Sequence, residues 1–126
     1  MAEFSKQIAL TFMTDEDLSS SAYRVVLLGT DNNVGITTST TVPATGITTD
    51  NVEDGSSTAA PVTVAVSGVV KAEVGAAVNA GVALMAATGG KVITCTSGNV
   101  AIGMALSTGG ADGDIISVLI DRYEMT

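Results

Sequence analysis

The sequence is poor in the side chains on which most enzymes depend. It contains no histidine, no tryptophan and a single cysteine, and aromatic residues make up only 3% of its 126 positions. Without histidine, the chain has no side chain whose ordinary pKa suits proton transfer at neutral pH. No serine stands in the G-x-S-x-G pattern of an activated nucleophile. These absences predict that the protein is not an enzyme.

The same shortages restrict metal and cofactor sites. With no histidine and one cysteine, the chain offers no soft-metal centre, and Cys95 is expected to be a buried strand residue. Asp112 and Asp114 are the nearest candidates for a catalytic or calcium-binding carboxylate pair, and Asp31 precedes two asparagines. Neither stretch has the spacing of a calcium loop. Both have the composition of tight turns, in which Asp bonds to nearby backbone amides, so we predict no metal and no cofactor.

Basic residues are also few. Five Lys and Arg stand against 13 Asp and Glu, which gives a formal net charge of −8. Because phosphate binding needs a surplus of clustered bases, direct contact with nucleic acid is not expected. The acidity instead favours solubility or contact with a basic protein surface. The chain shows neither a secretory leader nor an apolar run of membrane-spanning length, so we expect cytoplasmic synthesis and no membrane contact.

What the sequence does contain, from Val62 to Ile120, is a series of short apolar runs separated by Gly, Thr, Asn or Asp. This rhythm predicts an all-β fold, with a small body of short antiparallel strands. Val62, Val64 and Val66 are its candidate inward residues, and Gly68 marks a bulge. Since small aliphatic side chains bury little area each, we expect a subunit interface to add stability.

Further strands and turns follow from local composition. Residues 23–28 predict a strand, and residues 88–92 predict the turn of a hairpin. Residues 74–84 fit either a single helical turn or a winding β-corner, and the spacing of two glycines favours the corner.

The chain is short enough for one domain. We divide it into an N-terminal arm or edge strand at residues 1–21 and a β body at residues 22–126, with a Thr-rich loop or hairpin insertion at about 34–60. Two interpretations of the first segment stay open. It adds a first strand to the body, or it is an extended arm that clasps a neighbouring molecule.

Motifs in the second half of the chain resemble those of a known family. They are VSGVVK at residues 66–71, an Ala- and Gly-rich turn at 75–81, TGGKV at 88–92, GNVAIGMAL at 98–106 and ADGDIISVL at 111–119. This pattern is similar to that of the cement, or head-decoration, proteins of tailed bacteriophages. The motifs cover about half of the chain, and they are structural rather than catalytic.

The resemblance implies a β-barrel-like or β-tulip-like body, usually trimeric, on the outer surface of a mature, expanded phage capsid. The implied function is to stabilise that capsid, and the implied partners are the major capsid protein and further copies of the chain in a homotrimer. The implied location is the outer surface of the virion, after synthesis in the host cytoplasm. The arm and the Thr-rich insertion depart from the family pattern.

We expect the capsid contact to lie in the arm, because large apolar and aromatic side chains stand there outside the body. The predicted contact residues are Phe4, Ile8, Leu10, Phe12 and Met13. The alternative function is an adhesin or fibre-like surface module that binds a host receptor or glycan through the Thr-rich loops. The scarcity of aromatic residues argues against stacking on sugars.

Overall fold

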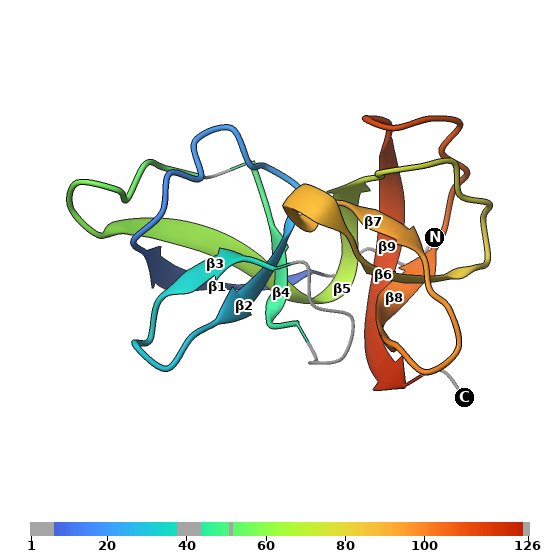
Figure 1. The fold of residues 1–126 in the computed structure, drawn as a ribbon, viewed down its shortest axis with the longest axis horizontal. Helices are drawn as coiled ribbons and strands as arrows, with labels where there is room; N and C mark the ends of the chain where they lie inside the picture. The colour runs from blue at the N-terminus through green and yellow to red at the C-terminus, as the bar shows by residue number, and fades with distance from the viewer. Residues whose placement is uncertain (1–6, 38–43, 51, 125–126) are drawn as a thin grey trace, which may run out of the picture.

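The computed structural model describes residues 7–37, 44–50 and 52–124 (Figure 1). These residues form nine strands and one short 3-10 helix, and every strand pairing among them is antiparallel, which confirms the all-β prediction. The elements are β1 (Ile8–Thr14), β2 (Val25–Leu28), β3 (Val34–Ile36), β4 (Gly46–Thr48), β5 (Ala60–Glu73), β6 (Ala83–Ala86), η1 (Thr88–Gly90), β7 (Val92–Thr94), β8 (Val100–Ala105) and β9 (Ile115–Glu124).

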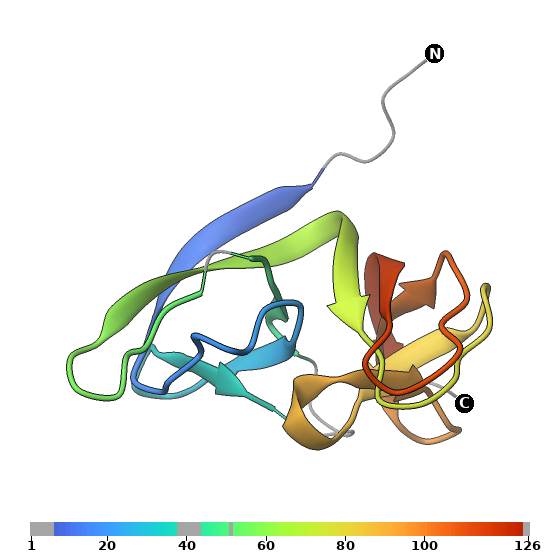
Figure 2. The same ribbon diagram turned by 90° about the horizontal axis from the view of Figure 1, so that it is seen from above.

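The strands form one sheet that bends into two curls sharing β5 (Figures 1 and 2). The strand order is β3-β2-β4-β5-β9-β8-β6-β7, and β1 also pairs with β5. The first half of β5 pairs with β1 and β4, and its second half pairs with β9. We call the part built on the first half the first curl and the part built on the second half the second curl.

Each curl comes close to closing on itself. In the first, Met13 of β1 forms an isolated parallel bridge to Asn33, the residue before β3. In the second, Val92 of β7 bridges to Val74, just after the end of β5. The barrel-like body predicted from the sequence is therefore two small, partly closed curls in series along one strand.

The transition between the curls occurs at Gly68. Its φ is +92°, a backbone conformation that glycine adopts without the strain a Cβ would cause. Pairing with β1 ends at Ser67 and pairing with β9 begins at Gly68. Figure 2 shows β5 turning toward β9 while β1 continues straight. The predicted irregularity at Gly68 is confirmed as a bend, and the register shift itself falls at Val66, which the pairing with β1 skips.

The core is aliphatic and continuous through both curls. Val62 and Val64 are buried in the first curl and Val66 packs against them, as the alternating pattern predicted. A larger cluster takes side chains from both curls, among them Val25, Ile47, Ala65, Val70, Leu84 and Val118. Because this cluster crosses the bend, the two curls form one packed body.

The remaining local predictions can be compared in the same way. Residues 74–82 contain no helix, and Gly81 has a φ of +91°, so the β-corner is confirmed. β6 and β7 form the predicted hairpin, closed by η1. The predicted insertion at 34–60 contains β3 and β4, both paired with β2.

We predict that Gly68→Ala lowers the free energy of unfolding by about 1–3 kcal/mol, because an L side chain is strained at this φ. Ser67→Ala is the matched control, since Ser67 is exposed and precedes the bend; it should change stability by less than about 0.5 kcal/mol. Urea unfolding of both variants measures the difference. Equal stability of the two would show that the bend does not depend on glycine.

Candidate docking surface

β1 is anchored to the body at one end and bare at the other. Alternate residues of a strand share a face, so Ile8, Leu10, Phe12 and Thr14 point the same way. Thr14 is buried and Phe12 packs on the core of the first curl. Ile8 and Leu10 lie beyond that core and are 52% and 50% exposed. The face of β1 that packs on the core therefore continues as exposed apolar surface at Ile8 and Leu10, which we call the bare strip.

The five residues that the sequence predicts to contact the capsid lie in different positions. Ile8 and Leu10 lie together on the bare strip, whereas Met13 is 41% exposed on the opposite face of β1. Phe12 is half-buried, so it contributes to anchoring the strand. Phe4 lies outside the described residues.

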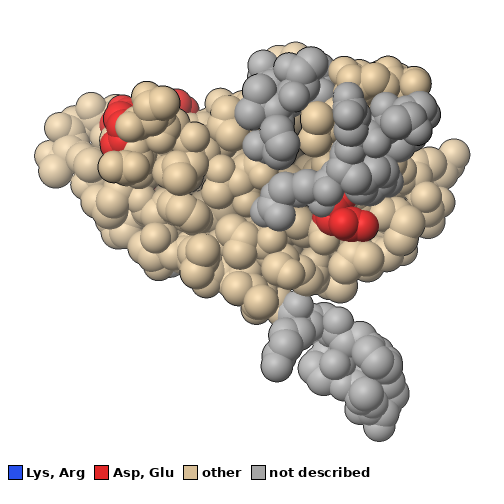
Figure 3. Space-filling model, turned by 90° about the horizontal axis from the view of Figure 1, so that it is seen from below, with Lys and Arg blue, Asp and Glu red and all other residues tan. Residues whose placement is uncertain are grey.

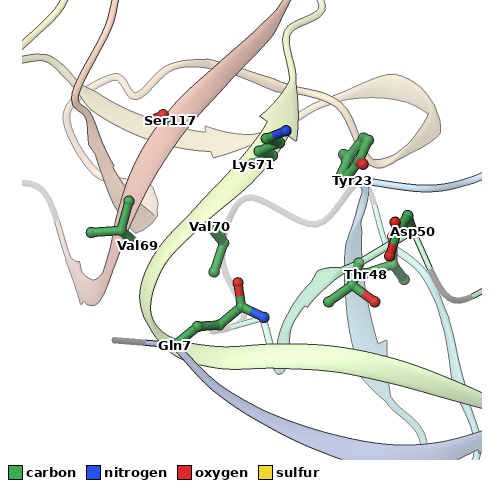
Figure 4. Close-up of a pocket in the computed structure, with 9 residues that line it drawn as sticks. Gln7, Tyr23, Thr48, Asp50, Val69, Val70, Lys71 and Ser117 are labelled. Carbon is green, nitrogen blue, oxygen red and sulfur yellow. The ribbon is translucent and has the colours of Figure 1, made fainter. Parts of the chain in front are cut away.

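A pocket of about 430 Å³ lies where β1 leaves the body, between the two curls. Its lining is mixed and includes the polar side chains of Gln7, Tyr23, Asp50 and Lys71. In Figure 4 the side chain of Lys71 points from β5 toward Tyr23, and Gln7 enters from the end of β1. Local sequence patterns gave no sign of this pocket, because its walls come from distant parts of the chain.

Tyr23 links the two curls through its backbone. Its N–H donates to the carbonyl of Thr48 at 3.0 Å, and its own carbonyl accepts from the N–H of Glu73 at 3.0 Å. Tyr23 has a φ of +64°, which is uncommon for a residue other than glycine. The two hydrogen bonds hold it in that conformation, with its ring at the pocket.

A cluster of ion pairs around Glu73 connects the two curls where they meet, a place that we call the joint. One carboxylate oxygen of Glu73 lies 3.2 Å from Nη2 of Arg24, and the other lies 3.4 Å from Nζ of Lys91. Lys91 also contacts Oδ1 of Asp112 at 2.8 Å, and Nη1 of Arg24 donates to the carbonyl of Gly89 at 2.9 Å. The hydrogen bond to Asp112 is the largest cause of a raised pKa for Lys91, which therefore stays charged. The sequence did not predict this cluster, since its members are far apart in the chain.

Of the acidic residues considered earlier for catalysis or metal binding, Asp114 and Asp31 accept hydrogen bonds from nearby backbone groups, whereas Asp112 pairs with Lys91. Oδ2 of Asp114 accepts from the backbone N–H groups of Gly110 and Ala111, at 2.8 and 3.1 Å. Oδ1 of Asp31 accepts from the N–H of Asn33 at 3.0 Å. The turn interpretation of both stretches is confirmed.

In the described part of the chain, no three or more His, Cys, Asp or Glu residues are arranged to hold a metal ion. Cys95 is buried as predicted, and burial raises the pKa of its thiol. No helix in the described ranges is long and apolar enough to cross a membrane.

The described residues expose little charge on one broad face of the molecule. Figure 3 views the side that lies at the bottom of Figure 1, where the β2–β3 turn and the C-terminal end of β9 are found. Among the described residues, no Lys or Arg atom is visible on this face, and Asp and Glu atoms appear only in small patches. Such a surface suits contact with protein rather than with phosphate.

Comparison with known proteins identifies a family and a solved structure of similar fold. A family model described as phage cement protein matches residues 5–120. Among solved structures, the chain is similar to the head fiber gp8.5 N base in bacteriophage phi29, with a TM-score of 0.71 and 15% identity. That match covers 96% of this chain and 99% of the other. No curated protein matches the sequence significantly. At 15% identity, the similarity to the fiber base establishes the fold alone.

We predict that Glu73→Gln lowers the free energy of unfolding by about 1–3 kcal/mol, because Arg24 and Lys91 lose their shared counter-charge. Partial exposure of the cluster favours the lower end of that range. Asp121→Asn is the control, since Asp121 is exposed and is in no ion pair among the described residues. Thermal or urea unfolding measures both variants. A Glu73→Gln protein as stable as the control would show that the ion pairs do not brace the joint.

Proposed function

Because the chain belongs to the phage cement protein family, we propose that it binds the outer surface of a mature, expanded capsid as a homotrimer and holds neighbouring capsid subunits together. Membership of the family makes it a structural, capsid-associated protein. The match over residues 5–120 is the observation that carries the proposal, because it includes β1 and both curls. The finer features, trimer and outer-surface decoration, are the ones to be tested.

We assign the capsid contact to the bare strip of β1. Ile8 and Leu10 each leave about half of a large aliphatic side chain in water. Covering that half in an interface is worth about 1 kcal/mol for each side chain. Pairing with β5 holds the backbone of the strip in an extended conformation, so little backbone entropy is lost on contact. Met13, on the other face of β1, is a further contact available to a second capsid subunit.

Such a contact is weak for one copy and adequate for a symmetric assembly. A trimer presents three strips, and after the first has bound the others act at high effective concentration. Overall avidity can then exceed the affinity of one strip by orders of magnitude. A cement protein of this design needs rigidity and repetition rather than an active site.

The proposal is tested by mixing the purified protein with expanded phage heads that lack it and imaging the particles. Saturable density on the outer surface, with three-fold features, is the expected result. Heads that remain bare at saturating protein would overturn the proposal. Binding to isolated glycans without binding to heads would favour the adhesin alternative.

We predict that the double substitution Ile8→Ser and Leu10→Ser lowers the apparent affinity for heads by about tenfold or more, because the strip loses its apolar surface. The body should stay folded, since both side chains lie outside the core. Leu28→Ser is the matched control, because Leu28 is 40% exposed on β2. Occupancy on heads can be measured by co-sedimentation. Equal loss in the control, or no loss in the double variant, would remove β1 from the contact.

A further inference from the structure

The outer face of the second curl carries an uncovered apolar row. Leu119 on β9 is the register partner of Val69 on β5 and of Met104 on β8. Directly paired residues of antiparallel strands point to the same side, so these three side chains form a row across the sheet. They alternate with core residues such as Val118, which places the row on the face away from the core. Leu119 is 37% exposed, and Val69 and Met104 are half-buried.

Lys71 lies within this apolar surface. Its register partner is Ser117, and Ile115 and Leu119 flank Ser117 on the same face of β9. Leu106, 41% exposed, donates its N–H to the carbonyl of Ser117. Ile115 is 46% exposed, so three large exposed aliphatic side chains lie on the same face of the sheet as Lys71, whose side chain also borders the pocket. We call this surface, residues 69, 71, 104, 106, 115, 117 and 119, the Lys71 face.

The charge of Lys71 is unpaired in the described part of the chain. Of the basic side chains described there, Arg24 and Lys91 are held in ion pairs, whereas no ion pair includes Lys71. Of the acidic groups nearby, Glu73 is already bound by the other two cations. Asp50 lines the same pocket as Lys71 but forms no ion pair with it, and Asp121 follows Leu119 by two residues on β9. An apolar surface with one unpaired cation has the composition of the centre of a protein interface. A carboxylate of the bound partner would neutralise that charge.

The chain itself carries a matching acidic surface on the first curl, away from the pocket. Two loops of the first curl run side by side there, joined by the hydrogen bonds Leu18 N–H to Glu53 carbonyl at 3.0 Å and Gly55 N–H to Glu16 carbonyl at 2.8 Å. Figure 1 shows these loops on the side of the first curl away from the second. The acidic ridge they form consists of Asp15, Glu16, Asp17, Glu53 and Asp54, all exposed.

The ridge also lacks counter-charges of its own. Among the described residues, no ion pair includes any member of the ridge. Hydrogen bonds from Ser56 lower the pKa of Asp54, which therefore stays ionised at neutral pH. The ridge and the Lys71 face are complementary in charge and are separate surfaces of one molecule.

We propose that the Lys71 face binds a second copy of the chain, and that the acidic ridge of that copy supplies the opposing carboxylates. Contact between two different surfaces of the same chain is head-to-tail, and it repeats around a ring when the rotation closes. Three copies would then form the trimer, so this inference rests on the trimer in the proposed function. It leaves the bare strip of β1 free for the capsid.

Charge reversal provides the test, with mass measured by light scattering in the absence of capsids. Lys71→Glu should shift the protein from trimer to monomer at micromolar concentration, because the new carboxylate faces the ridge. The double variant Asp15→Lys and Glu53→Lys should do the same from the other side. Neither Asp15 nor Glu53 has a side-chain hydrogen bond that the structure records, so the loops should keep their conformation. Combining all three substitutions in one chain should restore the trimer, because the swapped charges again attract each other. Residues that only stabilised the fold would not rescue one another in this way.

Apolar variants complete the test. Leu119→Ser should weaken self-association by about tenfold or more, while Leu28→Ser, also exposed but remote from the face, should leave the trimer intact. Circular dichroism should show that each variant remains folded. Salt should weaken the wild-type trimer, since the charges are exposed.

The outcomes separate this inference from the proposed function. The inference is overturned if Lys71→Glu remains a trimer or if the triple variant stays monomeric. It is also overturned if the wild-type chain is monomeric at every concentration tested. If Lys71→Glu stays trimeric but loses binding to heads, the Lys71 face is a capsid contact instead and the inference fails. If the wild type does not bind heads while Lys71→Glu dissociates, the self-association surface stands and the proposed function fails.

Discussion

The structure depends on the backbone hydrogen bonding of one long strand. β5, Ala60–Glu73, pairs with β1 and β4 along its first half and with β9 along its second. The exchange of partners at Gly68 turns one sheet into two curls. Because both curls are built on the same strand and share one aliphatic cluster, neither can move without disturbing the other. The relative positions of the exposed surfaces follow from this bend.

Polar contacts reinforce the joint between the two curls, in addition to the packing of the core. The core side chains are small, and aromatic residues are almost absent from the chain. Tyr23 joins β4 to the end of β5 through its backbone, and Glu73 collects Arg24 and Lys91 beside it. These contacts bring the start of β2, the end of β5 and η1 together at one point. The place where the two curls meet is therefore held by hydrogen bonds and ion pairs as well as by the core.

This geometry separates the exposed apolar side chains into distinct surfaces. The bare strip of β1 lies beside the bend, and the Lys71 face lies on the outside of the second curl. The acidic ridge occupies the far end of the first curl. Family membership gives the protein a structural role at the capsid. Separate surfaces for capsid and for self would allow a cement protein to assemble first and then bind at several points.

The sequence by itself determined the strand-and-turn character of the body and much of its local chemistry. Alternation identified Val62 and Val64 as core, glycine identified the bend, and turn composition accounted for Asp114, because all of these depend on neighbours in the chain. Family motifs supplied the class of function. Only the tertiary structure decided which strands pair, so the two curls and the ion pairs of Glu73 could not be predicted. It also decided that Phe12 packs on the core, whereas Ile8 and Leu10, on the same face of β1, are exposed. Burial depends on what packs against a face, and the packing partners of β1 are distant in sequence.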